Sequence, residues 1–217
     1  MSESGRDVSV SRLRDAELET AARLLARAFR DNPLNRAVIR SDDPARRERA
    51  NRHGMRGLLP VALGHAEVFA ARLGVRLVGV LVGLPPGTYP LPPPPLRERL
   101  RSVWGQGLGV AARWGEVFAE LHARHPAGPH WTLGTLGVEP AHQGQGVGTR
   151  LVQHWLEHVA EQEALPGEAD GPPDPRGPIY LETDREANLA FYRALGFEPI
   201  AEELLLGVRV WCLLRPA

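Results

Sequence analysis

A glycine-rich segment constrains this chain most, because it joins a strand-like run to a long amphipathic run. Residues 131–138 are rich in β-favouring residues, and Pro140 prevents a strand from continuing past them. The glycine-rich segment then occupies residues 143–149. After it, apolar residues recur with helical spacing at Leu151, Val152, Trp155, Leu156 and Val159. The sequence therefore predicts a strand, a turn, a glycine-rich loop and a helix across residues 130–163.

A glycine-rich loop that opens a helix favours the binding of an anion. The first N–H groups of a helix have no partner within it, and they carry the positive end of the helix dipole. Glycine has no Cβ atom, so a ligand can approach its backbone closely. We therefore expect a phosphate group to bind the backbone N–H groups of residues 143–149.

Two common phosphate-binding loops do not fit this spacing. A P-loop requires a lysine, and the chain contains none. A dinucleotide-binding loop requires a third glycine where Thr149 stands, and an acidic residue about 20 positions later at the end of a second strand. Glu163 and Glu168 instead flank an expected helix end and a loop.

Composition limits the class of protein further. The 217 residues are 43% hydrophobic, which suits a single domain, and 26 positive side chains balance 26 negative ones. This balance leaves no net positive charge that would attract nucleic acid or an acidic membrane surface. The polar N-terminus lacks a secretion segment, no apolar run approaches about 18 residues, and the single Cys212 cannot form an internal disulfide. We expect a soluble cytoplasmic protein, monomeric or homodimeric, with one domain over residues 1–217.

The N-terminal half alternates strand and helix patterns. The predicted elements are a strand at 8–13, a helix over about 15–29 that ends at Asp31-Asn32-Pro33, an arginine-rich and largely solvated helix over about 45–59, and a hairpin of residues 65–72 and 77–82.

An unusual segment follows the hairpin. Residues 84–95 carry seven prolines and are expected to be extended and exposed. Residues 96–125 read as helix that is apolar on one side and interrupted by glycines at 105, 107 and 109. We interpret residues 84–128 as a Pro-rich and helical insertion that packs beside the sheet and can cover a substrate cleft.

The C-terminal part predicts a mobile loop, a strand, a helix and a closing strand pair. The predicted ranges are 163–177 for the loop, 179–181 for the strand, 186–195 for the helix, and 204–207 with 208–214 for the antiparallel pair. Gly196 is placed to end the helix, with Phe197 packing beside it.

Two motifs carry a family resemblance. The spacing Gln-x-x-Gly-x-Gly, from Gln143 through Gly146 and Gly148, resembles the pyrophosphate-binding loop of the GNAT superfamily of N-acetyltransferases. The run Asn-Leu-Ala-Phe-Tyr-Arg-Ala-Leu-Gly-Phe at 188–197 is similar to the last helix of those enzymes, about 45 residues beyond the loop. Residues 28–33, 130–152, 180–183 and 211–212 look like the puromycin N-acetyltransferase branch. Puromycin itself is not implied, because substrate contacts would come from the divergent remainder.

The resemblance implies a mixed α/β fold, the GNAT fold. Its central sheet has six to seven mostly antiparallel strands, is splayed at the cofactor site and is flanked by helices. The implied reaction transfers acetyl from acetyl-CoA to an amine of a small molecule by direct attack, through a tetrahedral intermediate and without a metal. Two alternatives stay open, which are acetylation of a protein or peptide and a non-catalytic acyl-CoA-binding sensor.

The resemblance also assigns site residues. The cofactor-binding set is Leu136, Gly137, Val138, Gln143, Gly144, Gln145, Gly146, Val147, Gly148, Thr149, Thr183, Asn188 and Tyr192. The peptide-like pantetheine arm would pair with the strand edge at 136–138, and the N–H near Leu136 would stabilise the oxyanion.

Proton transfer requires an acid and a base. Tyr192 matches the family's general acid, which protonates a thiolate whose pKa lies near that of free cysteine, about 8.5. The alternative is a tyrosine that only packs or hydrogen-bonds the cofactor. Glu182 is the first candidate for the base, and the alternative is a carboxylate that orders the loop around Thr183. His130, Glu67 and His65 are weaker candidates.

Four other histidines are interpreted as surface residues. His154 and His158 have the i,i+4 spacing of metal ligands, but no third ligand is evident and they lie off the apolar stripe. We expect them on a solvated helix face, and we expect the same of His122 and His125.

Overall fold

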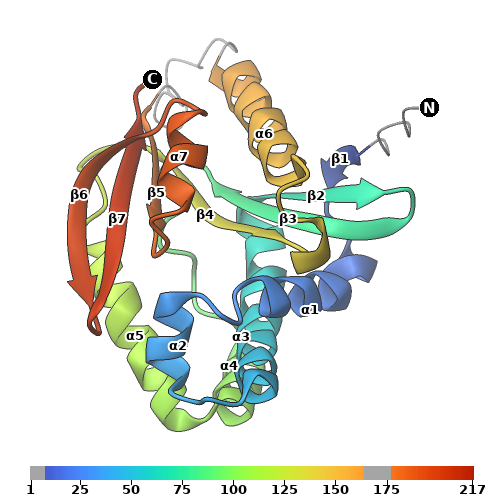
Figure 1. Cartoon of the computed structure of the whole chain (residues 1–217), viewed down its shortest axis with the longest axis vertical. Helices are drawn as coiled ribbons and strands as arrows, with labels where there is room; N and C mark the ends of the chain where they lie inside the picture. The colour runs from blue at the N-terminus through green and yellow to red at the C-terminus, as the bar shows by residue number, and fades with distance from the viewer. Residues whose placement is uncertain (1–7, 164–176) are drawn as a thin grey trace.

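Residues 8–163 and 177–217 are described in the computed structural model, and they build one seven-stranded sheet with helices on both faces (Figure 1). The mobile loop predicted over 163–177 lies outside the described residues except at its ends. The strands are β1 Val8–Arg12, β2 Glu67–Leu73, β3 Arg76–Leu84, β4 Trp131–Val138, β5 Ile179–Thr183, β6 Glu198–Leu205 and β7 Val208–Arg215.

The strand order is β1-β2-β3-β4-β5-β7-β6, and every neighbouring pair except β4 and β5 is antiparallel. The predicted mixed α/β fold with a mostly antiparallel sheet of six to seven strands is therefore confirmed. The predicted hairpin is β2–β3. The closing pair is β6–β7, but β6 starts at Glu198, so the prediction of a strand at 204–207 was too short.

The helices are α1 Leu18–Ala28, α2 Pro33–Ile39, α3 Pro44–His65, α4 Leu96–Gln106, α5 Leu108–His122, α6 Val147–Glu163 and α7 Asn188–Arg193, with short 3-10 turns at Asp15–Glu17 and Pro140–His142. Among the described residues, no helix combines the length and apolar character needed to cross a membrane.

The N-terminal helices differ from the sequence prediction in two ways. Pro33 ends α1 as predicted but also starts α2, where a proline suits the first helical position. The second predicted helix continues past Leu59 to His65 because its Leu59 and Ala62 are fully buried. It is also less solvated than its arginines suggested. Arg47 is buried, and its guanidinium donates to the carbonyls of residues 30, 41 and 42.

The two faces of the sheet carry separate hydrophobic cores. Helix α6 covers one face, where Leu151 and Trp155 are fully buried against Trp131. Helices α1 and α3 cover the opposite face, so neighbouring residues Ala70 and Ala71 of β2 belong to different cores. The sheet therefore holds α6, and the loop that precedes it, in a fixed place.

The Pro-rich and helical segment packs mainly against helices, not against the centre of the sheet. Helix α4 lies on α3, where Ser102 Oγ donates to the carbonyl of His53 at 3.0 Å. Helix α5 packs its Val117 and Leu121 with residues of α2 and the outer strands, including Val210. The prediction that it packs beside the sheet was thus right only for α5.

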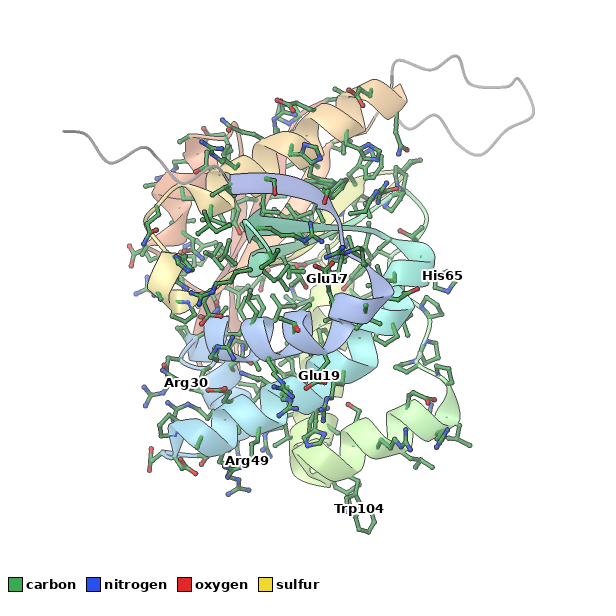
Figure 2. All side chains as sticks on the ribbon, turned by 90° about the vertical axis from the view of Figure 1, so that its right-hand side faces the viewer. Glu17, Glu19, Arg30, Arg49, His65 and Trp104 are labelled. Atoms are coloured by element: carbon green, nitrogen blue, oxygen red, sulfur yellow. The ribbon has the colours of Figure 1, made fainter. Side chains whose placement is uncertain are left out.

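The apolar side predicted for this segment is partly exposed. Trp104 of α4 is 91% exposed and points away from the protein in Figure 2. Leu100 and Phe118 are also more than half exposed. The two helices meet at Gly107, which has a φ of +95°. Glycine adopts this conformation readily, and it interrupts the helix.

Candidate active site

Strands β4 and β5 separate soon after they begin. They pair at only two positions, Trp131 with Ile179 and Thr132 with Tyr180, although β4 continues to Val138 alongside β3. Beyond these pairs the two strands diverge, as Figure 1 shows. The edge of β4 at residues 136–138 therefore faces a gap, and the splayed sheet expected from the sequence is present.

The end of β4 is braced from two sides. The guanidinium of Arg27 in α1 makes a two-pronged ion pair with Glu139, with N–O distances of 2.9 and 2.6 Å. Such a fork fixes direction as well as distance. Gly137 has a structural role beside its predicted cofactor role, because a Cβ there would collide with Leu25 of α1. Helix α1 thus lies directly behind the strand edge that faces the gap.

The glycine-rich loop has the open backbone that anion binding requires. Gly144 and Gly146 have φ angles of +72° and +80°, and a Cβ at either would meet no atom within 4 Å. The side chains of the two glutamines brace the loop. Gln143 Nε2 donates to the carbonyl of Val138 at 3.1 Å, and Gln145 Nε2 donates to that of Ala141 at 3.0 Å.

Helix α6 starts at Val147, inside the loop predicted over residues 143–149. The hydrogen bond from Arg150 N–H to the carbonyl of Gly146, 3.0 Å, closes its first turn. Val147 is buried, whereas Gly148 and Thr149 are only half-buried beside it. The first N–H groups of a long helix therefore lie next to the splayed end of β4, with the positive end of its dipole.

Two cofactor candidates on β5 and α7 contact each other. Asn188 Nδ2 donates to Thr183 Oγ1 at 3.0 Å, and Thr183 is buried. This bond ties the first turn of α7 to the end of β5. The contact of these two residues with coenzyme A stays a prediction.

Tyr192 lies in the core on α7, at 7% exposure. Its ring packs edge-on to Phe191 and Phe197, with centroid distances of 4.9 and 5.9 Å. Burial raises the pKa of its phenol well above the ordinary value, and the nearby carboxylate of Asp184 adds to this effect. The phenol is therefore protonated at neutral pH. This state suits a general acid, but the packing fits the alternative role equally well.

Glu182 points to the other side of β5 from Thr183, because side chains alternate along a strand. Its Oε1 lies 3.3 Å from His125 Nε2, and the two side chains are 16% and 5% exposed. His125 Nδ1 lies 2.9 Å from His130 Nε2, and the ring stacks on Tyr89 with centroids 3.6 Å apart. Glu182 thus belongs to a buried polar cluster.

The prediction that His125 is a solvated surface residue was wrong. It follows the end of α5 and turns inward to β5, so its surroundings depend on how α5 packs. His122, one turn earlier, is exposed as predicted. The loop-ordering role considered for Glu182 belongs instead to Asp184, which the sequence reasoning missed.

Asp184 joins the end of β5 to the start of α2. Its Oδ2 accepts a hydrogen bond from the N–H of Leu34 at 2.8 Å, and its Oδ1 accepts one from Asn32 Nδ2 at 3.3 Å. Burial raises the pKa of this carboxyl, and the two donors oppose the shift. The polar run Glu182-Thr183-Asp184 at the end of β5 was a signal for this residue.

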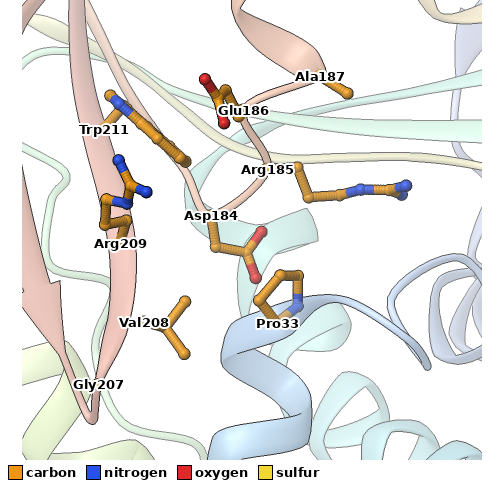
Figure 3. A pocket seen from close by; sticks show the side chains of 9 residues that line it. All are labelled: Pro33, Asp184, Arg185, Glu186, Ala187, Gly207, Val208, Arg209 and Trp211. Carbon is orange, nitrogen blue, oxygen red and sulfur yellow. The ribbon is translucent and has the colours of Figure 1, made fainter.

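Asp184 also borders an open pocket of about 430 Å³. Figure 3 shows its carboxylate directed toward Pro33 at the start of α2. The pocket is lined by Pro33, Asp184, Arg185, Glu186, Ala187, Gly207, Val208, Arg209 and Trp211. It therefore opens between α2, the β5–α7 connection and the β6–β7 turn.

The remaining candidates lie outside this arrangement. His65 is exposed at the end of α3, and Glu67 lies on β2, where Arg12 and His158 engage it. His154 and His158 were expected on a solvated face, but both rings contact Phe69 and are half-buried. Within the described parts of the chain, no group of three or more metal-binding side chains forms a metal site.

The chain was compared with known proteins. Residues 102–199 match the family model described as Acetyltransferase (GNAT) domain, a range that runs from within α4 through both motifs. A mycothiol acetyltransferase from Mycobacterium sp. (strain JLS) is 31% identical over 112 residues, which are 48% of this chain and 34% of the relative. The N-alpha-acetyltransferase RimI of Mycobacterium tuberculosis is 31% identical over 118 residues, 52% of this chain and 65% of the relative.

The fold likeness covers more of the chain. A Corynebacterium glutamicum structure described as histone acetyltransferase HPA2 and related acetyltransferase superposes with a TM-score of 0.64 at 23% identity, over 96% of each chain. By contrast, the chain spans about a third of the length of the mycothiol acetyltransferase. The likeness to the puromycin branch stays a prediction. The family model and both relatives agree that residues 102–199 form a GNAT acetyltransferase domain, and the splayed sheet has the fold of that family.

Proposed function

We propose that this protein is an acetyl-CoA-dependent N-acetyltransferase that acts on an amine of a small molecule. The observation that carries the proposal is the gap between β4 and β5, bordered by the open glycine-rich loop and the start of α6. The match of residues 102–199 to the GNAT domain supports acetyl-CoA as the acetyl donor.

Backbone groups would hold the cofactor. Its pyrophosphate would accept hydrogen bonds from the backbone N–H groups of residues 143–149. Its pantetheine arm would form backbone hydrogen bonds with the free edge of β4 at residues 136–138. The thioester would then lie in the gap. The N–H near Leu136 would stabilise the oxyanion, a type of donor whose loss typically lowers the rate about 10²- to 10³-fold.

Side chains would move the protons. The amine must lose a proton before it attacks, and Glu182 is the proposed acceptor. The departing thiolate must gain one, and the protonated phenol of Tyr192 is the proposed donor. Glu182 lies on β5 and Tyr192 on α7, the helix that follows this strand.

The pocket beside Asp184 supports a small acceptor. It adjoins the end of β5, and it is lined by the indole of Trp211, by the carboxylates of Asp184 and Glu186, and by the guanidinium groups of Arg185 and Arg209. We assign the acceptor side of the site to this region and to the cluster around Glu182.

A turnover assay that measures thiol release tests this proposal. Purified protein mixed with acetyl-CoA and a panel of small amines should release free thiol. The change Tyr192→Phe should lower kcat at least tenfold and leave coenzyme A affinity unchanged, because only the proton donor is lost. An unchanged rate would remove Tyr192 as the acid. Tight coenzyme A binding without turnover on any amine or peptide would favour the sensor alternative.

Acetylation of protein N-termini is the second candidate. The similarity to the N-alpha-acetyltransferase RimI favours it, whereas the mycothiol acetyltransferase similarity favours a small molecule. Adding peptides with different first residues to the same thiol assay separates the two. A kcat/KM for one peptide far above that for every small amine would assign the protein to this class.

A further inference from the structure

We propose that Glu182, His125 and His130 form a proton relay, which takes up the proton lost by the acceptor amine and passes it to solvent. This inference rests on the proposed acetyltransferase activity. It assigns a task to His125 and His130, two side chains that flank the start of β4 and are brought to Glu182 by the fold alone.

The three side chains form a continuous line. Glu182 Oε1 lies 3.3 Å from His125 Nε2, and His125 Nδ1 lies 2.9 Å from His130 Nε2. His130 Nδ1 lies 2.9 Å from the carbonyl oxygen of Gly128. The line runs from the buried carboxylate, through a buried imidazole, to the half-buried ring of His130.

The hydrogen bonds fix where the protons are. A carbonyl oxygen only accepts, so His130 Nδ1 must carry a proton. In neutral His130 the other nitrogen, Nε2, then accepts a proton from His125 Nδ1. A neutral His125 has no second proton, so its Nε2 presents a lone pair toward the carboxylate of Glu182.

Two acceptors therefore face each other in a buried place. His125 Nε2 and Glu182 Oε1 are both fully buried and neither meets hydrogen-bond geometry with a described residue, and the hydroxyl of Tyr180 is the other polar group near this carboxylate. An unpaired buried polar atom is unfavourable, because it has lost its hydrogen bonds to water without gaining others. One proton placed between these two atoms would satisfy both of them. The Glu182–His125 pair can therefore accept one proton.

The reaction releases one proton, which matches this capacity. The substrate ammonium gives a proton to the Glu182–His125 pair, and its nitrogen then attacks the thioester carbonyl. When the C–S bond breaks, the thiolate takes the phenolic proton of Tyr192, and the second amine proton restores the phenol. The products are the amide, coenzyme A thiol and one proton, which enters His130 at Nε2 and leaves to water from Nδ1 when that N–H releases the carbonyl of Gly128.

The surroundings are compatible with transfer to solvent. Burial lowers the pKa of His130, so its ring stays neutral and able to accept a proton down to a lower pH than an ordinary histidine. The other titratable or charged groups around the relay are Tyr89, His122, Tyr180, Cys212, Glu203 and Arg124. Burial raises the pKa of Tyr89, Tyr180 and Cys212, so these three groups stay protonated at neutral pH.

The test is the pH profile of kcat in His125→Phe. Phenylalanine keeps the stacking on Tyr89 but removes both nitrogens. We expect kcat at neutral pH to fall roughly 10²-fold with an unchanged KM for acetyl-CoA, and the loss to shrink as pH rises and more of the amine is already neutral. The matched control is His122→Phe, a histidine near the same tyrosine but outside the line, which should leave kcat unchanged.

Three results would overturn the relay while the proposed activity stands. These are a normal kcat profile in His125→Phe, an equal loss in the control, and a loss that does not depend on pH. A wild-type protein without turnover would reject the proposed activity instead. The relay is then judged by NMR titration of His130, where Glu182→Gln should lower the pKa of the ring because the carboxylate that raises it is lost. An unchanged titration contradicts it.

Discussion

The two sides of the gap between β4 and β5 are built in different ways. The proposed cofactor side is mainly one continuous segment, residues 131–163, which offers backbone groups that α6 holds in place, and Thr183, Asn188 and Tyr192 of β5 and α7 join it. The acceptor side gathers side chains from distant parts of the chain, among them Tyr89, His125, Glu182 and Asp184. A cofactor shared by a whole family can be bound by the backbone, whereas an acceptor needs side chains that can vary.

Strand β5 separates the two sides. Successive side chains on a strand point to opposite faces, so Thr183 meets Asn188 of α7 and Glu182 meets His125 beyond α5. A shift of this strand by one residue would exchange the two sets. The pairing of β5 with β7, which places Glu182 opposite Cys212, fixes the register.

The largest effect should come from removing the support of the cofactor side. Trp155→Ala deletes a fully buried indole between α6 and the sheet, and it should lower the free energy of unfolding by about 3–5 kcal/mol. Trp104→Ala is the matched control, since that indole is 91% exposed and its removal should change stability by less than about 0.5 kcal/mol. Urea unfolding measures both, and equal losses would contradict the described packing of α6.

A smaller effect should separate binding from stability. Gly146→Ala places a Cβ on a residue with φ +80°, at a site that is otherwise open, and it should lower coenzyme A affinity about tenfold by straining the loop. Gly74→Ala introduces the same kind of strain in the β2–β3 turn, with φ +57° and open space. Calorimetric titration should show weakened binding only for Gly146→Ala. A similar loss in the control would mean that strain acts on the whole fold.

The smallest effect concerns the acceptor side and pH. The pKa of Asp184 is raised in the folded protein, so its stabilising contribution is complete below the unfolded value, near 3.8, and is lost as pH rises through the folded value. Asp184→Asn removes this titration but keeps an oxygen for the N–H of Leu34. The stability difference between wild type and variant should therefore shift toward the variant as pH rises from about 3 to 7. Parallel thermal-melting curves across this range would contradict the assignment.

The sequence by itself determined the local elements, because these depend on residues that are close together in the chain. The strand, loop and helix of residues 131–163 follow from apolar periodicity and glycine, and the end of α7 follows from Gly196, whose φ is +86°. The resemblance of these two segments to the GNAT superfamily gave the fold, and the comparisons agree with it.

Tertiary structure alone decided the acceptor side. No local pattern places His125 at 3.3 Å from Glu182, or the carboxylate of Asp184 at the start of α2, because each contact joins residues far apart in sequence. The same limit explains why Trp104 was read as part of a packed face although it is exposed. Periodicity shows which face of a helix is apolar, but only packing decides whether another element covers it.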